Sequence, residues 1–196
     1  MARLHPGGRR QAPPGAAMLS AMASDFQRRK ISVVFGAMDA DDDGYLTEAD
    51  FRALTARWLD VRGTDDATPE GGKLAAIMMG WWATLRDASD RDRDGKVSLD
   101  EVLGVVDELP RMPGAVTGTA SAMFEAVDEN GDGAISAAEY GRMIEAWGGT
   151  PADDVFALLD TDGDGRLSHD EFTRHWYEFW AGDDPAAPGS WVFGRV

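Results

Sequence analysis

A twelve-residue pattern occurs four times in this chain, and it constrains the fold more than any other feature. The copies occupy residues 39–50, 90–101, 128–139 and 160–171, and they are called the first to fourth loops below. Each copy begins with aspartate and has glycine at its sixth position and an aliphatic residue at its eighth. Repetition of this kind indicates that one supersecondary unit recurs along the chain. The fold should therefore contain four similar units.

Apolar residues at helical spacing flank the loops. Ile31, Val34 and Met38 share one helical face before the first loop, and Phe172 and Trp176 share one after the fourth. Each loop therefore lies between two helices. The pattern predicts an all-α fold of four helix–loop–helix units in two pairs, packed into one compact domain.

The loop starts are unevenly spaced, at intervals of 51, 38 and 32 residues. The extra length lies between the first two loops, where Thr68 and Pro69 are typical of a helix start and a long apolar stripe follows. The segment 148–151 should end one helix and cap the next. The expected division is a disordered leader at 1–23, loop pairs at 24–110 and 119–181, a linker at 111–118, and a tail at 182–196 that packs on the core.

The loops carry oxygen ligands at the spacing that a hard cation requires. Calcium takes six to eight oxygen ligands, which a twelve-residue loop supplies from positions 1, 3, 5, 7, 9 and 12. Position 7 contributes only its backbone carbonyl. The predicted metal ligands are Asp39, Asp41, Asp43, Tyr45 and Asp50; Asp90, Asp92, Asp94, Lys96 and Glu101; Asp128, Asn130, Asp132, Ala134 and Glu139; and Asp160, Asp162, Asp164, Arg166 and Glu171.

Three other loop positions support this interpretation. Glycine at position 6 suits a sharp turn with positive φ. Serine or threonine at position 9, followed three residues later by an acid, predicts a capping box for the exiting helix. The aliphatic residue at position 8 predicts a short antiparallel β-bridge between the first and second loops and another between the third and fourth.

These residues closely resemble the EF-hand superfamily over about residues 24 to 181. The long first interval, the proline-broken middle and the apolar tail resemble the sarcoplasmic calcium-binding proteins and their calerythrin-like relatives. The resemblance implies a single compact domain that acts as a cytoplasmic calcium buffer or transporter. The four loops predict up to four bound ions, and we expect a monomer.

The four loops are not expected to be equivalent. Asp50 ends the first loop where the family has glutamate, and its shorter side chain reaches calcium less easily as a bidentate ligand. Magnesium prefers six closer ligands, so the first loop could favour Mg²⁺. Asn130 leaves the third loop with three ligating carboxylates instead of four.

Composition excludes several classes of function. The 35 acidic and 19 basic side chains give a formal charge of -16, which disfavours nucleic acid and anionic membrane surfaces. The absence of cysteine excludes thiolate metal sites and disulfides. No apolar run is long enough for a membrane span. No catalytic constellation is recognised, so we do not expect an enzyme.

Two alternatives to a buffer remain open. A calcium sensor would expose a Met-rich groove to a helix of a partner protein, which the sequence does not identify. A relative of the calcium-triggered photoproteins would hold an organic chromophore, for which His175, Trp176 and Tyr177 are conceivable contacts. The seven tryptophans are spread over the helices and the tail, and tryptophan at helical spacing favours a fixed core and hence a buffer.

Overall fold

The computed structural model describes residues 23–194 and has eight α-helices there. The expected leader, apart from Ala23, and the last two residues of the expected tail lie outside this range. The helices are α1 (Asp25–Met38), α2 (Glu48–Arg62), α3 (Pro69–Ser89), α4 (Leu99–Val106), α5 (Pro113–Val127), α6 (Ala137–Ala146), α7 (Asp153–Leu159) and α8 (His169–Ala181). Two 3₁₀ turns, η1 (Leu109–Arg111) and η2 (Pro188–Trp191), complete the helical elements.

Each loop ends in a capping box that starts the exiting helix. Helices α2, α4, α6 and α8 begin after side-chain N-caps at position 9 of their loops, and the acid at position 12 accepts a hydrogen bond from the backbone N–H of the N-cap residue. These contacts satisfy N–H groups that have no partner within the helix. The N-caps are Thr47, Ser98, Ser136 and Ser168.

The predicted pairing of loops is confirmed. Strands β1 (Tyr45–Leu46) and β2 (Val97–Ser98) form one antiparallel bridge, with Leu46 opposite Val97. Strands β3 (Ala134–Ser136) and β4 (Arg166–Ser168) form the other, with Ile135 opposite Leu167. All four aliphatic side chains are fully buried.

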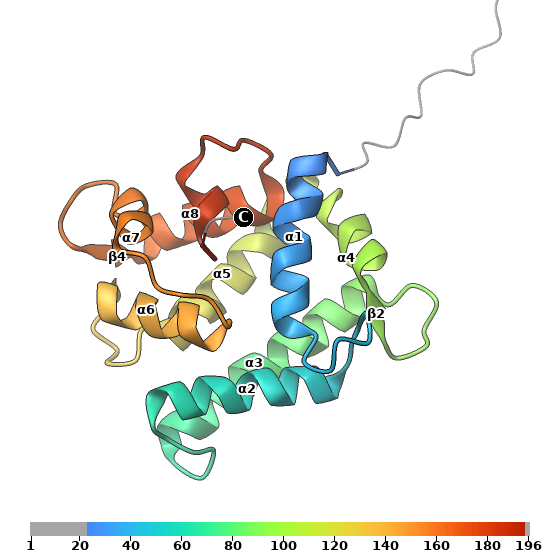
Figure 1. Ribbon diagram of the computed structural model, residues 1–196, viewed down its shortest axis with the longest axis horizontal. Helices are drawn as coiled ribbons and strands as arrows, with labels where there is room; N and C mark the ends of the chain where they lie inside the picture. Colours follow the sequence, from blue (N-terminus) through green and yellow to red (C-terminus); the bar gives the residue numbers. More distant parts are fainter. Residues whose placement is uncertain (1–22, 195–196) are drawn as a thin grey trace, which may run out of the picture.

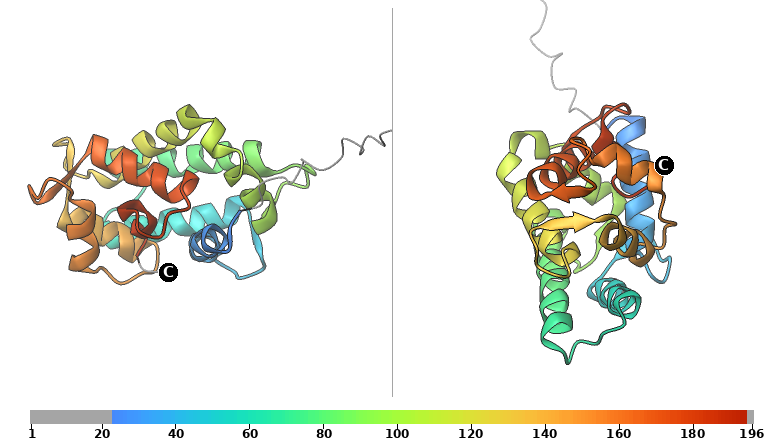
Figure 2. Two further views of the ribbon diagram at one scale, coloured as in Figure 1. Left: turned by 90° about the horizontal axis from the view of Figure 1, so that it is seen from above. Right: turned by 90° about the vertical axis from the view of Figure 1, so that its left-hand side faces the viewer.

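The two loop pairs lie at opposite ends of the molecule, and the helices between them share one core (Figures 1 and 2). Helix α5 packs against α8, α2 packs against both α3 and α6, and α1 contacts α4. Trp81 of α3 joins the two halves, because its ring lies 5.7 Å from that of Trp147 and 6.3 Å from that of Trp176. No helix within residues 23–194 is long and apolar enough to cross a bilayer.

Two helix starts differ from the sequence prediction. Most of the range 111–118, expected as a linker, belongs to α5, which begins at Pro113; only Met112 separates it from η1. Proline is acceptable there because the first helical N–H needs no partner within the helix. Helix α7 begins at Asp153 after Ala152, so Thr150 does not cap it.

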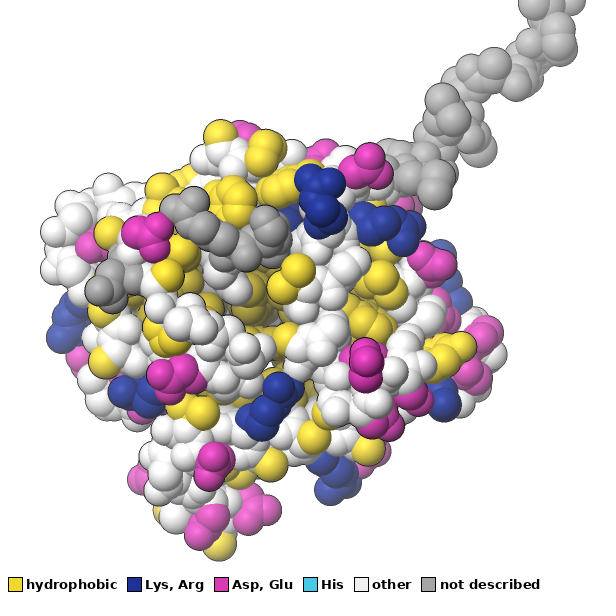
Figure 3. Space-filling model, viewed as in Figure 1, with side chains coloured by type: hydrophobic (Ala, Val, Ile, Leu, Met, Phe, Trp, Pro, Cys, Tyr) yellow, Lys and Arg dark blue, Asp and Glu magenta, His cyan; other side chains and the backbone are white. Residues whose placement is uncertain are grey.

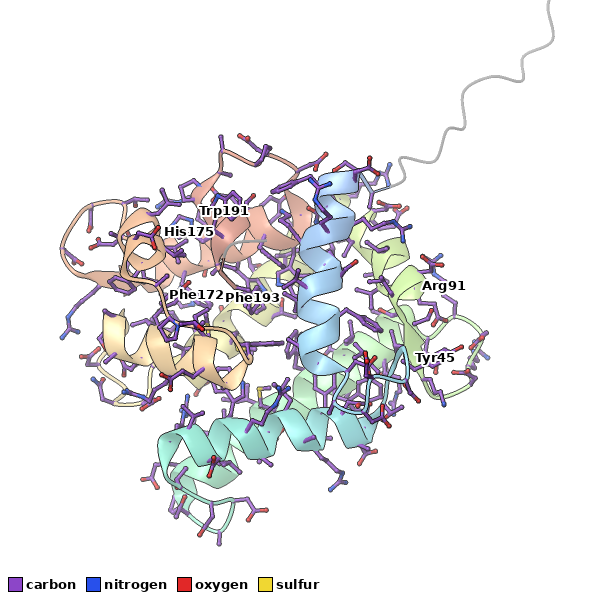
Figure 4. All side chains as sticks on the ribbon, viewed as in Figure 1. Tyr45, Arg91, Phe172, His175, Trp191 and Phe193 are labelled. Atoms are coloured by element: carbon purple, nitrogen blue, oxygen red, sulfur yellow. The ribbon has the colours of Figure 1, made fainter. Side chains whose placement is uncertain are left out.

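The C-terminal segment lies against α8 and α7. Val192 is fully buried, and Phe193 is 8% exposed, with its ring 4.8 Å from that of Phe179. The hydroxyl of Tyr140 donates a hydrogen bond to the Val192 carbonyl at 3.2 Å. In Figure 4, Phe193 lies in the interior of the C-terminal half. These contacts make residues 188–193 part of the core.

Candidate metal centres

The first aspartate of each loop is held by N–H groups of the turn that follows it. The N–H of Gly44 donates to Asp39 at 2.9 Å, and that of Gly165 donates to Asp160 at 2.8 Å. The second and third loops make the same contact from their sixth residue. All four sixth-position glycines have φ +84°, which favours glycine. The turn therefore directs position 1 into the loop.

The acid at position 12 closes each loop through the same backbone contacts. In the fourth loop, Glu171 accepts from the N–H of Thr161 at 3.0 Å and from the N–H of Ser168 at 3.0 Å. The acids at position 12 of the other three loops accept the equivalent bonds from positions 2 and 9. The carboxylate is thus fixed at the point where the exiting helix begins.

These hydrogen bonds lower the pKa of the three closing glutamates. Burial acts to raise the pKa of Glu171, but hydrogen bonds from Ser168 and Thr161 outweigh it and lower the pKa to about 2. The pKa of Glu139 is lowered in the same way against burial, and that of Glu101 is lowered chiefly by the N–H of Ser98. Ionised carboxylates are the form that binds a hard cation.

Three loops bring carboxylate oxygens close enough to surround one ion. Calcium–oxygen distances of 2.3–2.6 Å place ligand oxygens at most about 5 Å apart. One oxygen from each member of three groups lies within 4.8 Å of the others. The residues of these loops therefore fit a divalent cation. The groups are Asp39, Asp41 and Asp43; Asp90, Asp92 and Asp94; and Asp160, Asp162 and Glu171.

The third loop is arranged differently. It has an amide, Asn130, at position 3, and its Nδ2 donates to Asp132 Oδ2 at 3.2 Å. The same carboxylate oxygen lies 2.7 Å from Arg166 Nη1 of the fourth loop. Arg166 is the main reason why the pKa of Asp132 is lowered. The third loop thus offers fewer carboxylates to an ion, and one of them already forms an ion pair with Arg166.

The first loop keeps its geometry despite ending in aspartate. Asp50 accepts from the N–H of Ala40 at 2.9 Å and from that of Thr47 at 2.8 Å, as glutamate does in the other loops. Desolvation and the neighbouring carboxylates of Asp43 and Asp50 raise the pKa of Asp41. That repulsion would be relieved by a bound cation.

The residues at position 7 lie in or beside the β-bridges. Their N–H groups donate to the carboxylate at position 5 of the same loop, at 2.8–3.1 Å. Their side chains vary widely in size and charge, as expected if the backbone carbonyl alone contributes to the site. These residues are Tyr45, Lys96, Ala134 and Arg166.

Sequence analysis missed position 4 of the loops, where the backbone is also left-handed. Gly131 and Gly163 have φ +69° and +74°, and Asp42 and Arg93 have φ 57° and 62°. The two glycines were the available signal, but the non-glycine residues in the other loops obscured it. Position 4 therefore constrains the turn in the same way as position 6.

The histidine considered for a chromophore contact has protein partners on both ring nitrogens. His175 is 1% exposed, with Nε2 2.7 Å from the Leu159 carbonyl and Nδ1 3.1 Å from Glu178 Oε2. The residue links α8 to the end of α7. It serves packing in this structure.

Comparison with known proteins gives consistent matches. Two sequence families, both described as EF-hand domain pairs, match residues 16–57 and 120–177. The chain is 30% identical over 176 residues to the probable calcium-binding protein CML29 of Oryza sativa subsp. japonica, covering 85% of this chain and 93% of that protein. It is 25% identical over 192 residues to the sarcoplasmic calcium-binding protein alpha chain of Penaeus vannamei, covering 89% and 98%.

A solved calcium-binding protein of Streptomyces coelicolor has a TM-score of 0.65 and 26% identity, covering 81% of this chain and 99% of that one. These matches therefore cover most of the chain. Together with the loop geometry, these matches show that the chain belongs to the EF-hand family of calcium-binding proteins, in the group related to the sarcoplasmic calcium-binding proteins.

Proposed function

We propose that the protein is a monomeric cytoplasmic calcium buffer that binds up to four ions. The proposed ligands are the residues at positions 1, 3, 5 and 12 of each loop, with the carbonyl at position 7. Fifteen of the sixteen side chains at the four side-chain positions are carboxylates, Asn130 being the exception. Four calcium ions would bring the formal charge from -16 to about -8.

The observation that carries the buffer proposal is the closed aromatic core. Sensors open on binding and expose a methionine-rich groove, whereas buffers barely open. Here Met38, Met78, Met123 and Met143 are at most 2% exposed. Phe193 packs within 5.5 Å of Trp147 and Trp176, ring centre to ring centre. An opening motion would have to separate these rings.

The acidic surface supports rapid capture of cations. Loop residues hold 20 of the 35 acidic side chains, and Figure 3 shows acidic side chains gathered at the end formed by the first and second loops. Concentrated negative charge raises the local concentration of cations and their association rate.

Calcium titration with a hydrophobic dye tests the proposal on one sample. We expect up to four ions to bind by calorimetry, a markedly higher melting temperature in millimolar calcium than in chelator, and no gain in dye fluorescence. Equal melting temperatures together with no binding heat would reject calcium binding. A calcium-dependent rise in dye binding would contradict the proposal of a buffer and support a sensor that exposes a hydrophobic groove.

The first loop is proposed to be the site most open to magnesium. Asp50→Glu lengthens the closing side chain and should raise calcium affinity there, because a glutamate can supply two oxygens to the larger ion. Calorimetry of the variant with and without magnesium measures this. Glu101→Asp in the second loop is the matched control and should lower calcium affinity. An unchanged titration for both variants would contradict the expectation.

A further inference from the structure

A basic side chain at position 7 of each even-numbered loop reaches across the loop pair. Arg166 Nη1 of the fourth loop lies 2.7 Å from Asp132 Oδ2 of the third. Lys96 Nζ of the second loop lies 3.8 Å from Asp43 Oδ2 of the first. Asp132 and Asp43 both occupy position 5 of their loops. The contact therefore has the same direction in both halves of the molecule.

The odd-numbered loops have no basic side chain at position 7 that could reach the even-numbered loops. These loops have Tyr45 and Ala134 at position 7, and neither is a basic residue. The Lys96 ammonium also lies 5.0 Å from the centre of the Tyr45 ring, which helps to hold it over the first loop. The β-bridges place these side chains, because they fix how each even loop lies beside its odd neighbour.

We propose that Lys96 and Arg166 lower the ion affinity of the first and third loops, so that each pair contains a stronger even-numbered site and a weaker odd-numbered site. The inference rests on the proposed function, since it takes the carboxylates at position 5 as ligands. A divalent ion that approaches Asp132 meets the Arg166 guanidinium on the same carboxylate. Two cations near one carboxylate repel each other, and the repulsion weakens binding.

Lys96 and Arg166 can lower the ion affinity of the neighbouring loop without disturbing the backbone of their own loop. Each is expected to give only its backbone carbonyl to its own loop, and the N–H groups of Lys96 and Arg166 are held by Asp94 and Asp164 at 2.8 Å and 2.9 Å. Their side chains are free to serve the neighbour. A substitution of the side chain therefore changes the odd site while the even loop keeps its backbone.

The proposed ligand residues also favour stronger binding by the even-numbered loops. Asp50 and Asn130, the two departures from the family pattern, both lie in odd-numbered loops. Each even-numbered loop keeps aspartate at positions 1, 3 and 5 and glutamate at position 12. Weaker ligands and a competing cation thus coincide at the first and third loops.

Amide signals of the sixth-position glycines can report the four loops separately. The N–H of each glycine donates to the first aspartate of its own loop, so ion binding there should shift its signal. The experiment is a calcium titration of the full-length ¹⁵N-labelled chain at low salt, followed by heteronuclear NMR. The reporters are Gly44, Gly95, Gly133 and Gly165.

Arg166→Gln should raise the calcium affinity of the third loop, reported by Gly133, by about three- to tenfold. It should change the affinity of the fourth loop, reported by Gly165, by less. Lys96→Gln should raise the calcium affinity of the first loop, reported by Gly44, by a smaller factor, because Lys96 lies farther from Asp43 than Arg166 lies from Asp132. Arg166→Lys keeps the charge and should stay close to wild type. Arg111→Gln removes the same charge from η1, which contains no loop residue, and should leave all four midpoints unchanged. Added salt should shrink the gain.

The outcomes separate this inference from the proposed function. If the glycine signals of the wild-type protein do not respond to calcium, the proposed function is rejected, because the loops do not bind the ion. If they respond but neither Arg166→Gln nor Lys96→Gln raises the affinity of its odd neighbour, the inference is overturned. A shift at Gly165 as large as that at Gly133, or an equal gain from Arg166→Lys, would also overturn it.

Discussion

The residue type at position 4 of the loops differs between the two halves of the molecule. Position 4 of every loop is left-handed, but only the third and fourth loops have glycine there. A side chain in this region costs about 1–2 kcal/mol, although aspartate tolerates it better than most residues. Asp42 is therefore less strained than Arg93. The second loop holds the greater strain.

Comparison of two substitutions at Arg93 tests this strain. Both Arg93→Gly and Arg93→Ala remove the charge, so their difference reports the backbone alone. We expect the glycine variant to be more stable by about 1 kcal/mol, measured by urea denaturation in saturating calcium. At Arg91, whose φ is not positive, the order should reverse. Equal stabilities at Arg93 would show that the left-handed residue is not strained.

Among the elements, η2 approaches α8 more closely than a side chain permits. A Cβ added to Gly189 would lie 2.4 Å from the His175 carbonyl oxygen and 2.6 Å from its Cα. The N–H of Gly189 also donates to Glu178 Oε2 at 2.8 Å. Glycine at this point lets Val192 and Phe193 reach the core.

Gly189→Ala should therefore displace η2 and lower the free energy of unfolding by about 1–3 kcal/mol. The displaced atoms are backbone, which cannot move aside as a side chain could. Thermal unfolding in calcium measures the loss. Gly118→Ala is the control, because Gly118 lies in α5 with open space around it and should gain helix propensity. Equal effects of the two variants would contradict the expected close contact.

Helix boundaries show where sequence reasoning succeeded and where it failed. The four exiting helices were predictable because position 9 caps each one through a local pattern. The start of α5 was not, since its prolines and glycines suggested a linker. Burial of Val116 and Ala120 outweighs that poor local propensity. The start of α7 at Asp153 follows its buried face, two residues before Val155, rather than the cap offered by Thr150.

The side-chain contacts between neighbouring loops could not be predicted from the sequence either. The proposed ligand positions follow from spacing within twelve residues, so the sequence alone predicts them, and in three loops the structure brings three of the predicted carboxylates within 4.8 Å of one another. The contacts of Lys96 and Arg166 depend on how two loops lie side by side. A pattern within one loop does not contain that information.

Across the whole molecule, α1 holds the C-terminal end of α8. Lys30 is fully buried, and its Nζ donates to the carbonyls of Phe179 at 2.9 Å and Gly182 at 3.0 Å. Gln27 donates to the Trp180 carbonyl at 2.8 Å. These carbonyls end a helix and have no partner within it. The first and last helices are thereby joined directly.

This contact predicts a rise in stability at alkaline pH. Burial lowers the pKa of Lys30 from 10.5 to about 8, against the opposing effect of Asp183 and Glu178. Between these values the unfolded chain binds more protons than the folded one, so stability rises with pH. From pH 8 to 9.5 the gain should be about 1–2 kcal/mol. Above pH 10 Tyr140 opposes it, because burial raises the pKa of its phenol.

Denaturation in saturating calcium between pH 8 and 9.5 measures the effect. Lys30→Met removes the titrating group and should flatten the profile, whereas Lys73→Met removes an exposed lysine that pairs with Glu125 and should leave it unchanged. A wild-type profile as flat as that of Lys30→Met would show that Lys30 does not titrate in this range.

The ring contacts of Trp81 with Trp147, Trp176 and Trp180, all within 6.4 Å, have a spectroscopic consequence. Indoles at such separations exchange excitation before they emit. Light absorbed by any one of them is therefore emitted by the group. Emission from these four tryptophans should therefore respond to calcium as one signal, which does not reveal which loop binds an ion first.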